Sequence, residues 1–145
     1  MGASSGAVRR LADVEVGESL PAKTVHIERA TLVQYAGASL DRNPIHWDER
    51  FARSVGLPDV IAHGMWTMGA AGSVVEEWAG DGGRVVEFGT RFTKPVVVPQ
   101  GGGAVEVTGV VKSVDEDTRR ATVELTATSG GDKVLGRCLA VVQLD

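Results

Sequence analysis

The stretch from Gly64 to Ala79 constrains the fold more than any other part of the chain. It is rich in Ala, Gly, Met and Val, and its apolar residues fall on nearly every side of a helix. Glycines between positions 80 and 83 mark its end. Since a helix that is apolar all round is buried, we predict one long central helix that the remaining elements cover.

The residues after position 83 change to the alternating apolar and polar pattern of strands. We predict an antiparallel meander of four strands, which span residues 84–94, 104–114, 119–129 and 133–144. On the N-terminal side we expect a strand at 21–27, a helix at 28–39, a loop at 40–47 and a short helix capped by Asp48 that continues to Val55. This order of elements is an α+β pattern in a single domain, residues 1–145, with residues 1–8 as a flexible tail.

The composition of the chain indicates which kinds of partner the protein can bind and in which compartment we expect it. The net charge of −4 argues against nucleic acid as a partner, and an anionic ligand would need a local basic patch. The single cysteine, Cys138, lies in an alternating apolar run, so we expect a buried thiol and no intrachain disulfide. We find neither a membrane-length apolar stretch nor a signal peptide, and we therefore expect a cytoplasmic protein with no membrane partner. The candidates for a basic patch are Arg42, Arg50, Arg53, Arg91 and Lys94.

The groups that could carry chemistry are concentrated between positions 35 and 48. Asp41 and His46 lie on a loop stiffened by Pro44, so the two side chains can converge although they are five positions apart. A carboxylate beside an imidazole forms an acid/base pair. The same residues also fit a plain turn, because Asp and Asn side chains bond their own backbone. A metal site built from His46, Asp48 and His63 is less favoured, since their spacing is not helical and Asp48 serves as a helix cap.

This stretch resembles the signature of the MaoC-like (R)-specific hydratase/dehydratase family. The signature runs from a tyrosine through Ser/Thr-Gly-Asp to Asn-Pro-Ile/Leu-His and a second Asp, and Leu40 stands where the family usually has Gly. Residues 61–65 and 91–96 resemble further family segments, and the likeness is strong to the HadB-type subunit of actinobacterial (3R)-hydroxyacyl-carrier-protein dehydratases. The signature positions matched in register are Tyr35, Ala36, Ser39, Asp41, Asn43, Pro44, Ile45, His46 and Asp48.

The resemblance implies a fold and an activity. The fold is a hot dog, in which an antiparallel sheet wraps around the long central helix and an edge strand commonly pairs with a second subunit. The activity is dehydration of a (3R)-hydroxyacyl thioester to a trans-2-enoyl thioester, or the reverse hydration, in type II fatty-acid synthesis. The substrate is carried on acyl-carrier protein or CoA, and the reaction requires neither a cofactor nor a metal.

The resemblance also implies roles for individual residues. Asp41 and His46 are the catalytic pair and hold one water between them; His46 takes the C2 proton and Asp41 assists departure of the hydroxyl. Other divisions of the two roles stay open, because such a pair titrates together. The backbone N–H of Gly64 stabilises the thioester oxygen. Asn43 and His63 are further substrate-binding candidates, and Trp66 and Ile45 are candidates for the acyl pocket. The residues alone favour a packed or capping role for His63, and core or pocket-wall positions for Trp47, Trp66 and Trp78.

Two alternatives remain open from the sequence. One is an acyl-thioesterase on the same fold, which would not need the Asn-Pro-Ile-His loop. The other is a subunit that is active only with a paralogous hot-dog partner, so we expect either a homodimer or a heterodimer.

Overall fold

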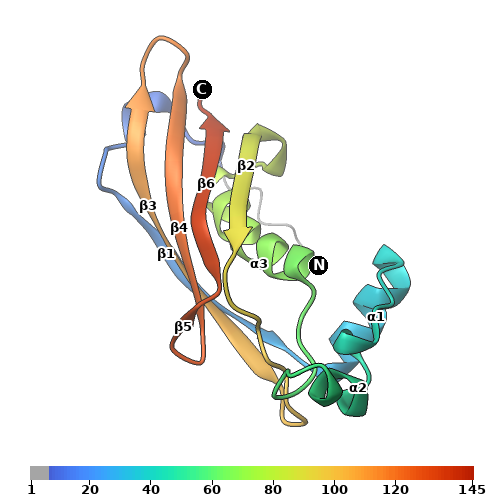
Figure 1. Cartoon of the computed structure of the whole chain (residues 1–145). Coiled ribbons are helices and arrows are strands. Elements are labelled where there is room, and N and C mark those ends of the chain that lie inside the picture. The colour runs from blue at the N-terminus through green and yellow to red at the C-terminus, as the bar shows by residue number, and fades with distance from the viewer. Residues whose placement is uncertain (1–6) are drawn as a thin grey trace.

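The computed structural model describes residues 7–145. One antiparallel sheet curves around the long helix α3, as Figure 1 shows. This confirms the expected α+β arrangement. The strands are β1 (Ser19–Ile27), β2 (Val85–Phe92), β3 (Gly103–Asp115), β4 (Arg120–Ser129), β5 (Asp132–Lys133) and β6 (Leu135–Gln143). The helices are α1 (Arg29–Ser39), α2 (Glu49–Ser54) and α3 (Gly64–Ala79), with single 3₁₀ turns at Leu11–Asp13, Pro44–His46 and Gly82–Arg84.

The core lies between α3 and the concave face of the sheet. Helix α3 has the predicted bounds and ends at Gly80, whose φ of 83° suits a residue without a side chain. Strands β4 and β6 alternate between buried and partly exposed positions, and their inward residues are Val, Ala, Leu and Cys. The buried residues of α3 are Thr67, Ala70, Ala71, Val74, Val75, Trp78 and Ala79.

The strand order corrects the expected meander. The order is β1-β3-β4-β6-β2, so β2 pairs with β6 and not with β3, the next strand in sequence. The connection from β2 to β3 does not turn back on itself, because it bonds to the segment that leads into α3. Ala62 N donates to Val96 O at 2.9 Å, and Val98 N donates to Val60 O at 2.9 Å. The predicted strand at 133–144 is also divided, into β5 and β6.

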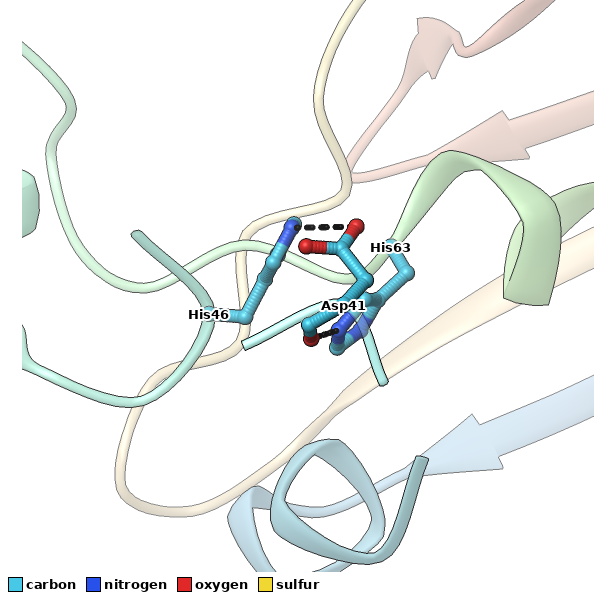
Figure 2. Close-up of side chains that lie close together, drawn as sticks. All are labelled: Asp41, His46 and His63. Atoms are coloured by element: carbon cyan, nitrogen blue, oxygen red, sulfur yellow. Dashed lines mark hydrogen bonds and ion pairs between the residues drawn. The ribbon is translucent and has the colours of Figure 1, made fainter. Parts of the chain in front are cut away.

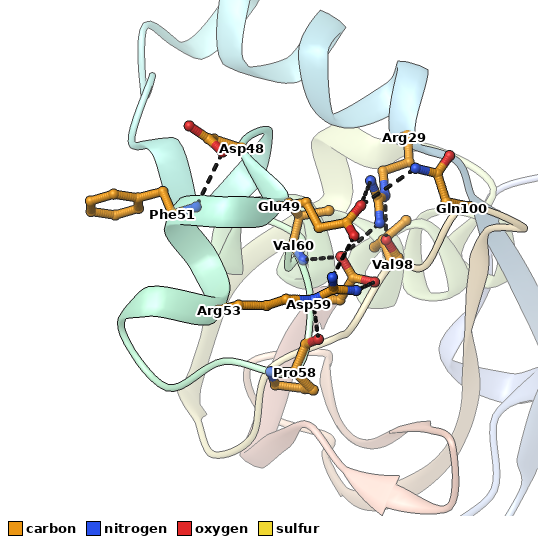
Figure 3. Close-up of polar contacts among 10 residues, drawn as sticks. All are labelled: Arg29, Asp48, Glu49, Phe51, Arg53, Pro58, Asp59, Val60, Val98 and Gln100. Carbon is orange, nitrogen blue, oxygen red and sulfur yellow. Dashed lines mark hydrogen bonds and ion pairs between the residues drawn. The ribbon is translucent and has the colours of Figure 1, made fainter.

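Helices α1 and α2 lie together beyond one end of the sheet (Figure 1). Arg29, the first residue of α1, ties them to the rest of the molecule, as Figure 3 shows. Its guanidinium bonds Glu49 of α2 at 3.1 Å, Asp59 at 2.6 Å and the carbonyl of Val98 at 2.8 Å. The Asp48 cap of α2 is confirmed, since its carboxylate accepts from Phe51 N at 3.1 Å.

Both ends of the described chain meet the end of α3. Arg9 N donates to Ala79 O at 3.2 Å, and Asp145 N donates to Arg9 O at 3.0 Å. Positions 1–6 of the expected tail lie outside the described residues. Cys138 is 1% exposed, which confirms the predicted buried thiol. Across residues 7–145, the helices are too short or too polar to span a membrane.

Candidate active site

The loop between α1 and α2 is built from successive side-chain bonds to its own backbone. Asp41 N donates to Ser39 Oγ, Asn43 N to Asp41 Oδ1 and Ile45 N to Asn43 Oδ1, each at 3.2 Å. The loop begins with Leu40 in the left-handed conformation at φ 65°, which is why Gly is the usual residue there. The turn interpretation is therefore confirmed, and the second Asp41 oxygen faces His46.

Asp41 and His46 face each other at the end of this loop (Figure 2). His46 is 5% exposed, and its Nδ1 bonds the carbonyl of Ile61 at 2.7 Å. Since a carbonyl only accepts, Nδ1 carries the hydrogen, and we assign a lone pair to Nε2. Nε2 lies 3.8 Å from Asp41 Oδ2, which is longer than a direct hydrogen bond. The Asp41 side chain is 54% exposed, so the pair can be reached from solvent.

The surroundings of His46 favour its neutral form. Burial lowers the pKa of His46, and the neighbouring His63 lowers it further. The hydrogen bond to Ile61 and the charge of Asp41 raise the pKa, but burial is the larger effect. A neutral imidazole with a free lone pair is a general base at neutral pH.

His63 lies against both members of the pair and is 2% exposed. Its ring stacks on the His46 ring, with 3.7 Å between centroids and 19° between planes. Its Nε2 bonds the backbone carbonyl of Asp41 at 3.0 Å. The structure thus places this sequence-predicted site residue under the pair, in contact with Asp41 and His46 and away from solvent.

One atom each from Asp41, His46 and His63 could approach a metal, since the three lie within 4.8 Å of one another. The geometry does not suit an ion. Imidazole lone pairs lie in the ring plane, and two rings inclined by only 19° direct them side by side instead of to one point. Asp48, which the sequence suggested as a third ligand, is used as the cap of α2.

Gly64 opens α3 directly beside the pair. The N–H groups of a first helical turn have no acceptor within the helix, and they carry the positive end of the helix dipole. A Cβ at Gly64 would lie 3.1 Å from the ring of Phe92, so the helix start and this ring approach closely. A cavity of about 180 Å³ adjoins them, and it is lined by Gly64, Thr67, Phe92, Thr93, Lys94, Pro95, Val96 and Val134.

The remaining predicted residues lie around this centre. Asn43 holds the turn through its bond from Ile45 N at 3.2 Å, and Ile45 is half-buried. Trp66 is also half-buried and packs against the core. Trp47 is 50% exposed and donates from Nε1 to Arg42 O at 3.0 Å, so it is not a core residue.

Two of the five basic candidates have carboxylate partners. Arg53 pairs with Glu49 at 2.8 Å, and Lys94 pairs with Asp132 at 3.1 Å. Within residues 7–145, Arg42, Arg50 and Arg91 form no ion pair.

Sequence reasoning missed two features of the site. The carbonyl of Ile61 fixes the tautomer of His46, and Tyr35 lies against His63 with 4.7 Å between ring centroids. No side-chain pattern could indicate the carbonyl, since its position depends on the path of the backbone. For the contact between Tyr35 and His63 the sequence did carry a signal, because His63 directly precedes the first residue of the buried helix.

Comparison with known proteins gives a consistent result. Residues 12–130 match the MaoC like domain. A 3-hydroxyacyl-thioester dehydratase X of Mycobacterium tuberculosis is 39% identical over 83 residues, which cover 57% of this chain and 29% of that protein. A 3-hydroxybutyryl-CoA dehydratase of Methylorubrum extorquens is 33% identical over 124 residues, covering 85% of this chain and 76% of that protein.

A solved structure described as a MaoC-like dehydratase superposes with a TM-score of 0.93 at 41% identity, over 95% of this chain and 43% of that chain. The chain thus spans less than half the length of that structure and of the mycobacterial relative. The curved sheet around α3 is the hot-dog fold that the signature implied. The match over residues 12–130 and these likenesses establish that the chain belongs to the MaoC-like family.

Proposed function

We propose that this chain is an (R)-specific hydro-lyase that interconverts (3R)-hydroxyacyl and trans-2-enoyl thioesters. The observation that carries the proposal is the neutral His46 Nε2 facing the Asp41 carboxylate across 3.8 Å. The names of the relatives, which include dehydratases of hydroxyacyl and hydroxybutyryl thioesters, support it.

The pair supplies what the elimination of water requires. In the dehydration direction His46 Nε2 takes the proton from C2, the C3–O bond breaks and a C2=C3 double bond forms. The proton goes from His46 to the departing hydroxyl, which leaves as water, so the reaction exchanges no net proton with solvent. Asp41 accepts a hydrogen bond from the hydroxyl and orients it. In hydration the same two groups hold the attacking water between them.

The N-terminus of α3 stabilises the charge that develops during this step. Removing the C2 proton places negative charge on the thioester oxygen, and a fixed N–H donor lowers the energy of that state. We assign this role to the backbone N–H of Gly64, the first residue of α3.

Further assignments concern the carrier and the acyl chain. We place the acyl chain near Ile45 and Trp66, and we assign Arg42, Arg50 and Arg91 to the phosphate groups of CoA or of a carrier-protein arm. Asn43 serves the substrate site through the loop shape that it holds. We place this activity in type II fatty-acid synthesis in the cytoplasm.

The direct test is the hydration of crotonyl-CoA, followed as the loss of absorbance of the conjugated enoyl thioester. We expect a (3R)-hydroxy product from the wild type, and no detectable product from Asp41→Asn or His46→Ala. His26→Gln is the matched control, because it removes an exposed imidazole of β1 and should leave the rate unchanged.

The same assay separates the two alternatives. Release of free CoA thiol without hydration would identify an acyl-thioesterase and contradict the proposal. If neither product forms, the assay is repeated with acyl-carrier-protein substrates and with a paralogous subunit. The sheet leaves β2, which has a strand neighbour only in β6 among the described residues, as the edge that we assign to a second hot-dog subunit. Size-exclusion chromatography with and without that subunit distinguishes a homodimer from an obligate heterodimer.

A further inference from the structure

One side chain touches both members of the catalytic pair. His63 bonds the backbone carbonyl of Asp41 through Nε2 at 3.0 Å, and its ring stacks on the ring of His46 at 3.7 Å (Figure 2). Because His63 is only 2% exposed, it can act on the reaction only through these two neighbours. It therefore differs from Asp41, whose carboxylate reaches solvent.

His63 is itself held by rigid structure. It is the residue before Gly64 and forms the N-cap of α3, and its carbonyl accepts from Thr67 N at 3.2 Å and from Thr67 Oγ1 at 3.4 Å. The ring of Tyr35, from α1, lies against it at an angle of 53°. The central helix and α1 together fix the ring that supports the pair.

An imidazole at this position lowers the stability of the fold in a way that a hydrocarbon ring would not. Nε2 faces a carbonyl and so carries the hydrogen, which leaves Nδ1 as an acceptor. Among the described residues, Nδ1 of His63 has no hydrogen-bond partner although it is buried. A buried acceptor without a donor destabilises the fold, whereas phenylalanine would fill similar space without that penalty. The benefit of histidine here is the donor that it directs at Asp41.

We propose that His63 is a positioning residue that sets the gap between the Asp41 carboxylate and His46 Nε2, a role that rests on the hydro-lyase function proposed above. It holds the backbone of one partner and the ring plane of the other. Among the described residues, the other hydrogen bonds of Asp41 are its local turn bonds with Ser39 and Asn43. Without His63, Asp41 keeps only these turn bonds, and the His46 ring loses the surface on which it lies.

The same contact affects the charge state of the base. The groups that face His46 are the Asp41 carboxylate, the His63 ring and the carbonyl of Ile61, with Tyr35 beyond His63. Burial lowers the pKa of His46 most, and His63 lowers it further. Removing the His63 ring should therefore raise the pKa of His46. Since the base must be neutral, the acid limb of the pH profile should move to higher pH.

Two substitutions separate the two contacts. His63→Gln keeps an amide donor for the Asp41 carbonyl and removes the stacked ring, while His63→Phe keeps a ring and removes the donor. We expect kcat for crotonyl-CoA hydration to fall roughly 100-fold in His63→Phe and roughly tenfold in His63→Gln, because sub-ångström displacement of catalytic groups has effects of this order. KM should change less than about twofold, since His63 does not contact substrate.

The readouts distinguish positioning from a role in folding alone. His63→Phe should unfold at a temperature no lower than the wild type, and the acid limb of kcat/KM should move to higher pH in both variants. His26→Gln serves as the control in each assay. If kcat and the pH profile of both variants match the wild type, the proposal is overturned; if His63→Phe does not fold, His63→Gln still gives both measurements.

A measurement without turnover keeps this test independent of the proposed activity. The pKa of His46 can be followed by NMR of ¹⁵N-labelled imidazoles, whether or not the protein hydrates a thioester. A raised pKa of His46 in His63→Gln and His63→Phe supports the coupling, and an unchanged pKa overturns it. If the wild type is inactive but the pKa of His46 is raised in the His63 variants, the result contradicts the hydro-lyase function and leaves the coupling between His63 and His46 supported.

Discussion

At the scale of single residues, His46 connects the chemistry of the site to the stability of the fold. Its pKa is lower in the folded chain than in the unfolded chain, chiefly because of burial. The folded state therefore binds fewer protons, and the free energy of unfolding decreases as the pH falls from about 6.5 towards the lower folded pKa. Above about pH 6.5 this contribution no longer changes with pH.

Urea unfolding between pH 5 and 8 tests this sign. In His46→Gln this part of the decrease should be absent, so the difference in free energy of unfolding between variant and wild type should change with pH only below about 6.5. A constant difference over the whole range would show that His46 has the same pKa in both states. Protein fluorescence is a suitable signal, since Trp78 is buried in the core.

The residue scale also shows how far sequence alone reaches into the site. The signature identified Asp41 and His46, and the structure brings them within 3.8 Å. The sequence could not indicate the bond from His46 to the Ile61 carbonyl or the stacking of His63, because both depend on the path of residues 55–63 between α2 and α3. Leu40 illustrates the same limit: its left-handed φ of 65° follows from the helix end that it terminates, and not from its side chain.

At the scale of elements, the start of α3 can be tested by two alanine substitutions in one helix. At Gly64 a methyl group would lie 3.1 Å from the ring of Phe92 and would occupy the approach to the backbone N–H. At Gly69 a methyl group meets nothing within 4 Å. Both changes replace glycine in a helix, where alanine is favoured by about 1 kcal/mol.

We expect Gly69→Ala to raise the free energy of unfolding by about 1 kcal/mol and to leave crotonyl-CoA hydration unchanged. Gly64→Ala retains the backbone N–H, but its methyl group should hinder the thioester oxygen from reaching it. We expect kcat/KM to fall by roughly 100-fold, the order found when an oxyanion donor no longer acts, with little change in stability. Chemical denaturation and steady-state kinetics measure the two quantities. Equal activity of the two variants would contradict the assignment of the Gly64 N–H as the donor that stabilises the thioester oxygen.

The ion network of Arg29 is the second feature at this scale, because it joins α1 and α2 to the loop segments at Asp59 and Val98 (Figure 3). The Asp59 side chain is only 13% exposed, and it pairs with Arg29 at 2.6 Å and with Arg53 at 3.7 Å. In Arg29→Met, Asp59 keeps the 3.7 Å contact with Arg53 and the 2.8 Å hydrogen bond from Val60 N, but it loses its short ion pair, and the Val98 carbonyl loses its donor. We expect the free energy of unfolding to fall by about 2 kcal/mol, less than for a fully buried pair because the network is partly exposed.

A surface pair provides the matched control for this network. Lys112 and Glu124 lie 3.6 Å apart on adjacent strands, with side chains 57% and 48% exposed. Lys112→Met should cost less than about 0.5 kcal/mol. Urea denaturation of both variants makes the comparison, and similar losses in the two would mean that the Arg29 network does not hold α1 and α2 to the fold.

At the scale of the whole molecule, the hydrophobic pattern predicted the elements better than their order. Alternation located the strands because half of each strand faces α3, and the apolar sequence of α3 predicted its bounds. Alternation carries no information on which strands are neighbours. The place of β2 beside β6 depends on residues 95–103, which bond to Val60 and Ala62 and so carry the chain across to β3, the neighbour of the opposite edge strand β1.

The single thiol can report whether this sheet opens as one unit. Cys138 lies in β6, which pairs with β4 on one side and β2 on the other, and Cys138 is 1% exposed. Burial raises the pKa of the Cys138 thiol, and its side-chain contact with Thr90 offsets this only in part. The low exposure of the thiol and its raised pKa both slow reaction with a disulfide reagent, because the thiolate is the nucleophile. Because Cys138 lies on the inward face of β6, exposing the thiol requires that α3 leaves the sheet or that β6 separates from a neighbouring strand.

We therefore expect Cys138 to be unreactive towards Ellman's reagent in native buffer and to react fully in urea, with a midpoint equal to that of fluorescence-detected unfolding. Coincident midpoints mean that the thiol becomes accessible only when the core is lost. Labelling at urea concentrations well below the fluorescence midpoint would contradict this. It would show that the contacts around Cys138, with α3 or with a neighbouring strand, open while the rest of the core remains folded.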